Sequence, residues 1–63
     1  MSEAESWIAW LERRLQWADR CTLPLYVATF KDGWKRDVGP LEAIPHEFRD
    51  KVSALYERLK QAR

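Results

Sequence analysis

The chain has 63 residues, enough for one small domain, and a chain of this length buries only about 60% of the surface that its unfolded form exposes. Eleven basic and ten acidic residues give a net charge of +1, which argues against a dedicated binder of polyanions. A single cysteine excludes an internal disulfide framework, the first residues are acidic where a signal peptide is basic, and no apolar run approaches about 20 residues. We therefore expect a soluble cytoplasmic protein that does not enter a membrane.

The first predicted element is a helix over about residues 3–21. Ser2 and Glu5 have the spacing of a capping box, in which the Ser2 hydroxyl accepts a hydrogen bond from the Glu5 amide. Three of the four tryptophans fall on one broad side of this helix, namely Trp7, Trp10 and Trp17. Arg14 follows Trp10 by one helical turn, so its guanidinium group can stack on the indole as a cation–π pair. The apolar face of the helix is therefore unusually wide.

The middle of the chain, about residues 25–38, predicts a β-hairpin. Pro24 ends the first helix, because proline removes a backbone donor and favours an extended conformation in the residue before it. Residues 25–30 are rich in β-branched and aromatic side chains, which is typical of a strand. Gly33 supplies a turn, and residues 34–38 return as the second strand. Both faces of the first strand are apolar, so one of them needs a cover from the following connection or from a second copy.

A second helix is predicted over about residues 45–62. Pro45 suits the first turn of a helix. The apolar positions then recur at spacings of four and three residues, at Phe48, Val52, Leu55, Leu59 and Ala62. The predicted fold class is therefore α+β, a single domain over residues 1–63 with α-β-β-α order, in which two helices pack on a β-hairpin.

Residue types that commonly perform catalysis or bind metals are sparse. His46 is the only histidine and Cys21 the only cysteine, and their separation matches no zinc-site spacing. Glycine occurs only at positions 33 and 39, so no phosphate-binding loop can be drawn. We interpret His46 as part of the first turn of the second helix and Cys21 as a small apolar residue near a helix end. The sequence therefore predicts no enzyme activity, no metal and no cofactor.

The eight aromatic side chains are more than a chain of this size can easily bury alone, which predicts a homodimer or a protein partner. Trp, Tyr and Arg are also the residue types most enriched in interface hot spots. We therefore predict a non-enzymatic protein-binding module, an adaptor or inhibitor that occludes a site on a larger protein. The predicted partner-binding residues are Trp10, Arg13, Arg14, Trp17, Lys31, Trp34, Lys35 and Arg36.

In size, aromatic content and lack of catalytic residues, the chain is similar in type to small proteins that phages and other mobile elements encode to block host machinery, anti-CRISPR proteins among them. No motif carries this likeness, so it assigns no role to any residue. Two alternatives stay open. The basic and aromatic hairpin turn indicates a nucleic-acid-binding regulator that uses Trp34, Lys35 and Arg36. The other alternative is a structural subunit of a larger assembly.

Overall fold

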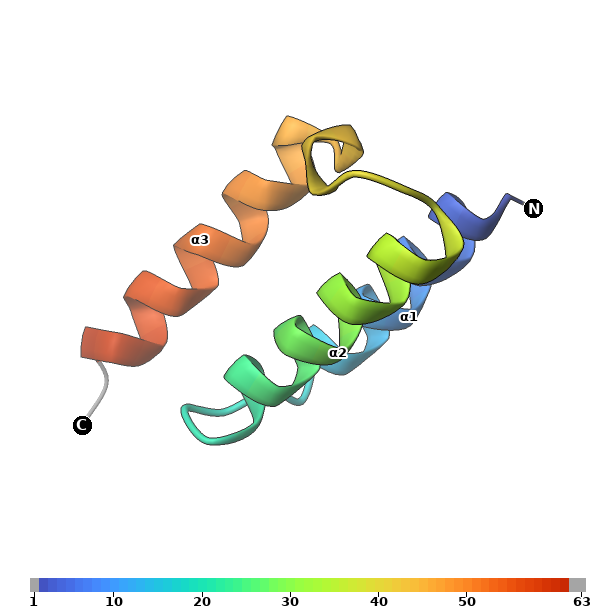
Figure 1. Cartoon of the computed structure of the whole chain (residues 1–63). Helices are drawn as coiled ribbons and strands as arrows, with labels where there is room; N and C mark the ends of the chain where they lie inside the picture. Colours follow the sequence, from blue (N-terminus) through green and yellow to red (C-terminus); the bar gives the residue numbers. More distant parts are fainter. Residues whose placement is uncertain (1, 62–63) are drawn as a thin grey trace.

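The computed structural model describes residues 2–61, and every regular element in that range is helical (Figure 1). Helix α1 spans Glu3–Leu15, α2 spans Thr22–Asp37, the short 3₁₀ helix η1 spans Leu41–Ala43, and α3 spans His46–Gln61. No residue between 2 and 61 lies in a strand, so the predicted α+β class with its α-β-β-α order is wrong. The fold is small and all-helical. That the whole chain forms one domain stays a prediction.

Helices α1 and α2 run antiparallel and pack side by side, whereas α3 runs back alongside α2 at a greater distance after η1 (Figure 1). The molecule is elongated, with extents of 37 × 18 × 17 Å. Its Cα radius of gyration is 11.7 Å, against about 10.6 Å for a compact chain of this length.

Helix α2 occupies the segment where the sequence predicted a β-hairpin. Its buried large side chains are Leu23, Val27, Phe30 and Trp34. Their spacings of four, three and four residues place them on one helical face. As a strand, residues 25–30 would expose an apolar face on each side. As a helix, the same residues bury one face, so tertiary packing overrides the local β propensity of the segment.

Two residues that predicted a break and a turn are accommodated inside α2. Pro24 lies in the first turn, where a missing backbone N–H removes no intrahelical hydrogen bond. Gly33 is buried against α1, and a β-carbon at this position would lie 2.2 Å from Cζ2 of Trp7. Gly33 is therefore needed for the close approach of two helices, and it makes no turn.

Helix α1 ends at Leu15, earlier than the predicted end near residue 21, because a second cap starts α2. The Asp19 carboxylate accepts hydrogen bonds from the amides of Cys21 and Thr22, both at 2.8 Å. Thr22 Oγ1 in turn accepts from the Asp19 amide at 2.9 Å, which completes a reciprocal box. The backbone hydrogen bonds of Thr22, and then those of Cys21, lower the pKa of Asp19 from its ordinary value of 3.8.

The connection from α2 to α3 is held by backbone and side-chain hydrogen bonds. The Gly39 amide donates to the Trp34 carbonyl at 2.9 Å, and the Gly39 φ of +147° turns the chain away from the helix. The Trp34 indole N–H donates to the Pro40 carbonyl at 3.0 Å. Arg49 of α3 donates through Nη2 to the Leu41 carbonyl in η1. These contacts fix the first turn of α3 to the end of α2.

Two local features lie where the sequence indicated. Ser2 Oγ accepts from the Glu5 amide at 3.2 Å, as the capping box predicts. Helix α3 occupies the region in which the second helix was predicted, and its buried residue is Phe48. Ala62, the last member of the predicted apolar series, lies outside the described residues.

The core of the described chain is aromatic and centred on Phe30. The Phe30 ring centroid lies 5.5 Å from Trp34, 5.6 Å from Phe48 and 6.5 Å from Trp7. Phe30 thus connects α1 to α3 through α2. The buried hydrophobic side chains are Leu11, Leu23, Val27, Phe30, Trp34, Ile44 and Phe48.

Candidate protein-binding surface

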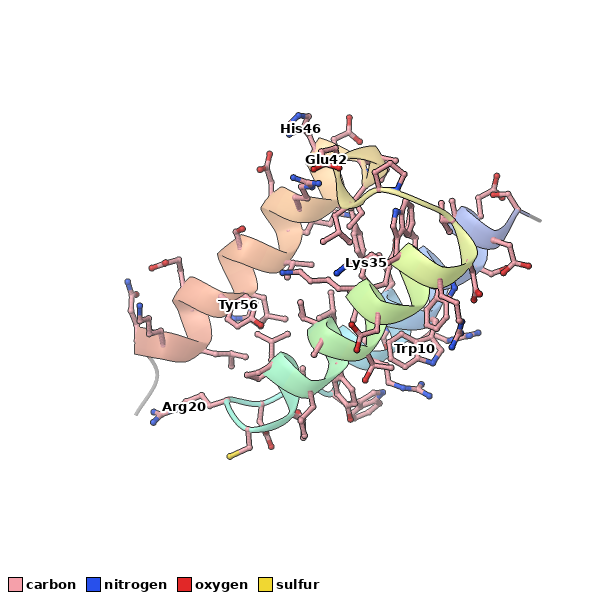
Figure 2. All side chains as sticks on the ribbon, viewed as in Figure 1. Trp10, Arg20, Lys35, Glu42, His46 and Tyr56 are labelled. Carbon is pink, nitrogen blue, oxygen red and sulfur yellow. The ribbon has the colours of Figure 1, made fainter. Side chains whose placement is uncertain are left out.

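The Trp10 indole is held between α1 and α2, on the side of the helical pair away from α3 (Figure 2). It is half-buried, and its ring makes edge contacts with Trp7 at 5.5 Å and with Tyr26 at 6.4 Å between centroids. Cζ of Arg14 lies 4.8 Å from the Trp10 ring centroid, which confirms the predicted cation–π pair. Because Arg14 is exposed, the pair presents a cation stacked on an aromatic ring to solvent.

Trp17 lies in the turn between α1 and α2 and is 82% exposed. The sequence placed it on the same helix as Trp10, but α1 ends two residues before it, so the indole leaves the helix face. Leu25, in the first turn of α2, is 66% exposed and adds a second large apolar side chain at this end of the helical pair. Of the predicted residues, Trp10, Arg13 and Arg14 lie on the second half of α1, and Trp17 lies in the turn that follows it. That they bind a partner stays a prediction.

The other four predicted residues lie on α2, and they form no turn. Trp34 is 1% exposed, so it belongs to the core and offers no surface to a partner. Lys31, Lys35 and Arg36 are exposed. The interleaving of cations with an indole is therefore a feature of the linear sequence only, because the helix turns the indole inward.

Asp37, at the end of α2, accepts hydrogen bonds from its neighbour Arg36 and from Trp7 of α1. Its carboxylate accepts from Nε of Arg36 at 2.9 Å and from the Trp7 indole N–H at 3.1 Å. The hydrogen bond from Arg36, and then that from Trp7, lower the pKa of Asp37 from its ordinary value of 3.8. The hydrogen bond to Asp37 and its charge raise the pKa of Arg36. Arg36 is thus engaged within the chain and is a weaker candidate for partner contact than Arg14.

A groove between α2 and α3, with a volume of about 310 Å³, is absent from the sequence prediction. Its floor is apolar and mostly buried, and its walls continue along α3 to Tyr56, which projects toward α2 (Figure 2). The apolar residues that line it include Val27, Phe30, Ile44, Phe48, Val52 and Tyr56. The helical spacing of the apolar residues in α2 is the signal that indicates this groove, because it gives α2 an inward face opposite that of α3.

Reactive groups are dispersed in the part of the chain that the structure describes. Cys21 directly precedes α2, whereas His46 is the first residue of α3. Within residues 2–61, no group of three His, Cys, Asp or Glu side chains is placed to hold a metal ion. The same residues contain no helix of the length and apolarity needed to cross a bilayer. No known protein family, curated protein or solved structure matches the chain.

Proposed function

We propose that the protein is a non-enzymatic protein-binding module, an adaptor or inhibitor that covers a site on a larger protein. The observation that carries this proposal is the exposure of Trp17, 82% of whose surface is open to water. Covering a large apolar side chain typically contributes about 1.5–3 kcal/mol. A partner that covers the exposed Trp17 indole would therefore gain binding free energy of this size.

The residues around Trp17 support a protein partner. Arg14 is stacked on Trp10, so its guanidinium group is already oriented and loses less conformational freedom when it pairs with a carboxylate. Arg13 is exposed on the same helix. A segment that combines tryptophan with oriented arginine has the composition of an interface hot spot.

Site-specific photo-crosslinking tests the proposal. Benzoylphenylalanine at position 17 should form a covalent adduct with a partner in cells, whereas the same group at Ala54, exposed on α3, should not. With the partner purified, Trp17→Ala and Arg14→Glu should each weaken binding by about tenfold or more while the far-ultraviolet circular dichroism stays helical. For an inhibitor, the partner's activity should fall as the wild-type chain is added. Binding that survives both substitutions would reject this surface.

Self-association and the other assembly role are separate predictions. A homodimer would cover part of the exposed apolar surface, and light scattering over a hundredfold concentration range tests it. A structural subunit would be unstable alone and rescued by co-expression with its neighbour. The single cysteine supports a reducing, cytoplasmic location. The nucleic-acid alternative is not proposed, because it depended on a hairpin turn that is absent from residues 2–61 and on Trp34, which is buried.

A further inference from the structure

The inner faces of α2 and α3 line a groove along most of their length. Near η1 the groove contains the apolar floor formed by Phe30, Ile44 and Phe48. Toward the other end it continues past Tyr56 into a second hollow of about 480 Å³, lined by Leu23 of α2 and Leu59 of α3. Tyr56 lines both hollows, so they adjoin each other at this side chain.

Beyond Phe48, the apolar residues of α3 along this groove are less covered. Phe48 is 6% exposed, Val52 and Leu59 are half-buried, and Tyr56 is 38% exposed. The chain has an accessible surface of 4830 Å², whereas a compact protein of 7.5 kDa exposes about 4,250 Å². This surplus of about 600 Å² is a property of the whole chain, and the exposed large apolar side chains are Trp17, Leu25 and Tyr56, of which Tyr56 lines the groove.

The charges that line the two hollows are mostly basic. Lys31 and Arg49 line the first, and Arg20, Lys60 and the acidic Glu57 line the second. Four basic side chains and one acidic side chain give the groove a formal charge of +3. The whole chain carries +1, so the remaining residues carry −2. The positive charge of the protein is therefore concentrated at this apolar groove.

We propose that the α2–α3 groove binds an amphipathic helix of a partner protein whose apolar stripe is flanked by aspartate and glutamate. The apolar face of α2 is buried, whereas α3 keeps Val52, Tyr56 and Leu59 partly uncovered. A further helix can lie against such a face between the ridges of two neighbouring helices, as in helical bundles and in helix-in-groove complexes. The apolar floor selects residues at positions i, i+4, i+7 and i+11 of the ligand helix. The basic rim selects acidic residues beside them and disfavours a basic helix.

A second copy of the chain is a poorer occupant than an acidic helix. In a two-fold dimer the same surface patch meets itself. Pairing through the groove would therefore bring one +3 surface against another, which opposes association.

This inference does not rest on the proposed function of the Trp10 to Trp17 segment. Of the eight predicted binding residues, only Lys31 lines the first hollow, and none lines the second. Binding at one surface can therefore be supported while binding at the other is rejected. If both surfaces bind, the protein is an adaptor with two partners.

A displayed library of helical peptides tests the groove. Each peptide has about 14 residues, which span roughly 21 Å. Leucine occupies the four stripe positions, and the flanking positions vary among Glu, Lys, Gln and Ser. Selection on the wild-type chain should enrich Glu at the flanks. Enrichment of Lys, no preference, or no binder would overturn the proposal.

Matched charge reversals on α2 and α3 then locate the site. Lys31→Glu should weaken the selected acidic peptide by about tenfold or more, whereas Lys51→Glu, the same charge change on an exposed α3 residue outside the groove, should change its affinity less than about twofold. Trp17→Ala should leave the affinity unchanged, which separates this test from that of the proposed function. Equal losses from Lys31→Glu and Lys51→Glu would overturn the assignment to the groove.

Backbone amide chemical shifts complete the experiment. Addition of the acidic peptide should shift the resonances of Val27, Lys31, Val52 and Tyr56. Shifts confined to residues 10–17 would overturn the proposal. So would a stable dimer in which these groove resonances are unaffected by peptide, because a second copy would then be the occupant.

Discussion

Helices α2 and α3 both have 16 residues, yet five residues of α2 are buried and one of α3 is buried. Helix α2 packs against α1 on one side and against η1 and the start of α3 on another, so its apolar face is covered along its length. Helix α3 meets the rest of the chain mainly through Phe48, and its later apolar residues line an open groove. An apolar stripe is thus necessary for burial but not sufficient, since burial also needs a facing element at the right distance.

The largest expected difference comes from equivalent deletions in the two regions. Phe30→Ala should cost about 3–5 kcal/mol, because Phe30 is 2% exposed and joins three other rings. Tyr56→Ala should cost about 1 kcal/mol or less, because Tyr56 is 38% exposed. Urea unfolding followed by circular dichroism measures both. If Phe30→Ala does not fold, Phe30→Leu should still cost more than Tyr56→Leu, and the reverse order would contradict the comparison.

The next largest effect concerns the close contact of α1 and α2 at Gly33. Gly→Ala inside a helix normally stabilises by roughly 0.5–1 kcal/mol. Here the new β-carbon would lie 2.2 Å from Trp7, so Gly33→Ala should instead destabilise by about 1–3 kcal/mol through overpacking. In a Trp7→Leu background the indole is gone and the sign should reverse. A double-mutant cycle from urea unfolding measures the coupling, and additive effects would show that the contact is not limiting.

Hydrogen exchange sharpens the comparison without substitutions. Amides at residues 27–34 of α2 should exchange only on global unfolding, because their side chains form the core. Amides at residues 55–60 of α3 should exchange about tenfold faster or more, through local opening of the less covered end of the helix. Exchange measured by nuclear magnetic resonance at several urea concentrations separates the two kinds of opening. Equal protection of both segments would mean that α3 is covered in solution, by a second copy or by closure on α2.

Low pH should destabilise the α1–α2 pair, and this is the smallest of the four predicted effects. The pKa values of Asp19 and Asp37 lie below their ordinary value of 3.8 in the folded chain. Their contribution to stability is therefore present above that value and is lost as the pH falls through the lower folded-state pKa values.

The melting temperature should consequently drop as the pH falls from about 5 to about 2, and the drop should be smaller in Asp19→Asn, which keeps a capping side chain but does not titrate. Thermal scans by circular dichroism at each pH measure the effect. An identical drop in the wild type and in Asp19→Asn would show that titration of Asp19 does not contribute to the loss of stability in acid.

Several local features were predictable because they depend on residues close together in the chain. The Ser2 cap and the stacking of Arg14 on Trp10 each involve two residues within one helical turn, where the helix geometry alone sets the distance. The periodic apolar stripe of α3 likewise needs only regular spacing. The surface segment from Trp10 to Trp17 was identifiable from composition, although its indole at position 17 leaves the helix.

The hairpin prediction was wrong because the residues that favoured it are also compatible with a helix. Residues 25–30 are β-branched and aromatic, and Gly33 follows them as a turn glycine would. The spacing of Leu23, Val27, Phe30 and Trp34 carried the opposite signal, and it becomes decisive only when another helix is available to cover that face. The groove between α2 and α3 was missed for the same reason, since a groove requires two inward faces and the prediction assigned one of them to a hairpin.

The order of residues alone was enough to predict a helical N-terminal cap, a periodic C-terminal helix and aromatic side chains left exposed. Those properties follow from neighbours in the chain and from counting side chains. The tertiary structure decided that residues 22–37 form a helix, that Gly33 admits the Trp7 indole, and that four basic residues line the hollows between α2 and α3. These outcomes depend on contacts between residues far apart in the chain, where the free energy of burying one face outweighs the weak conformational preferences of individual residues.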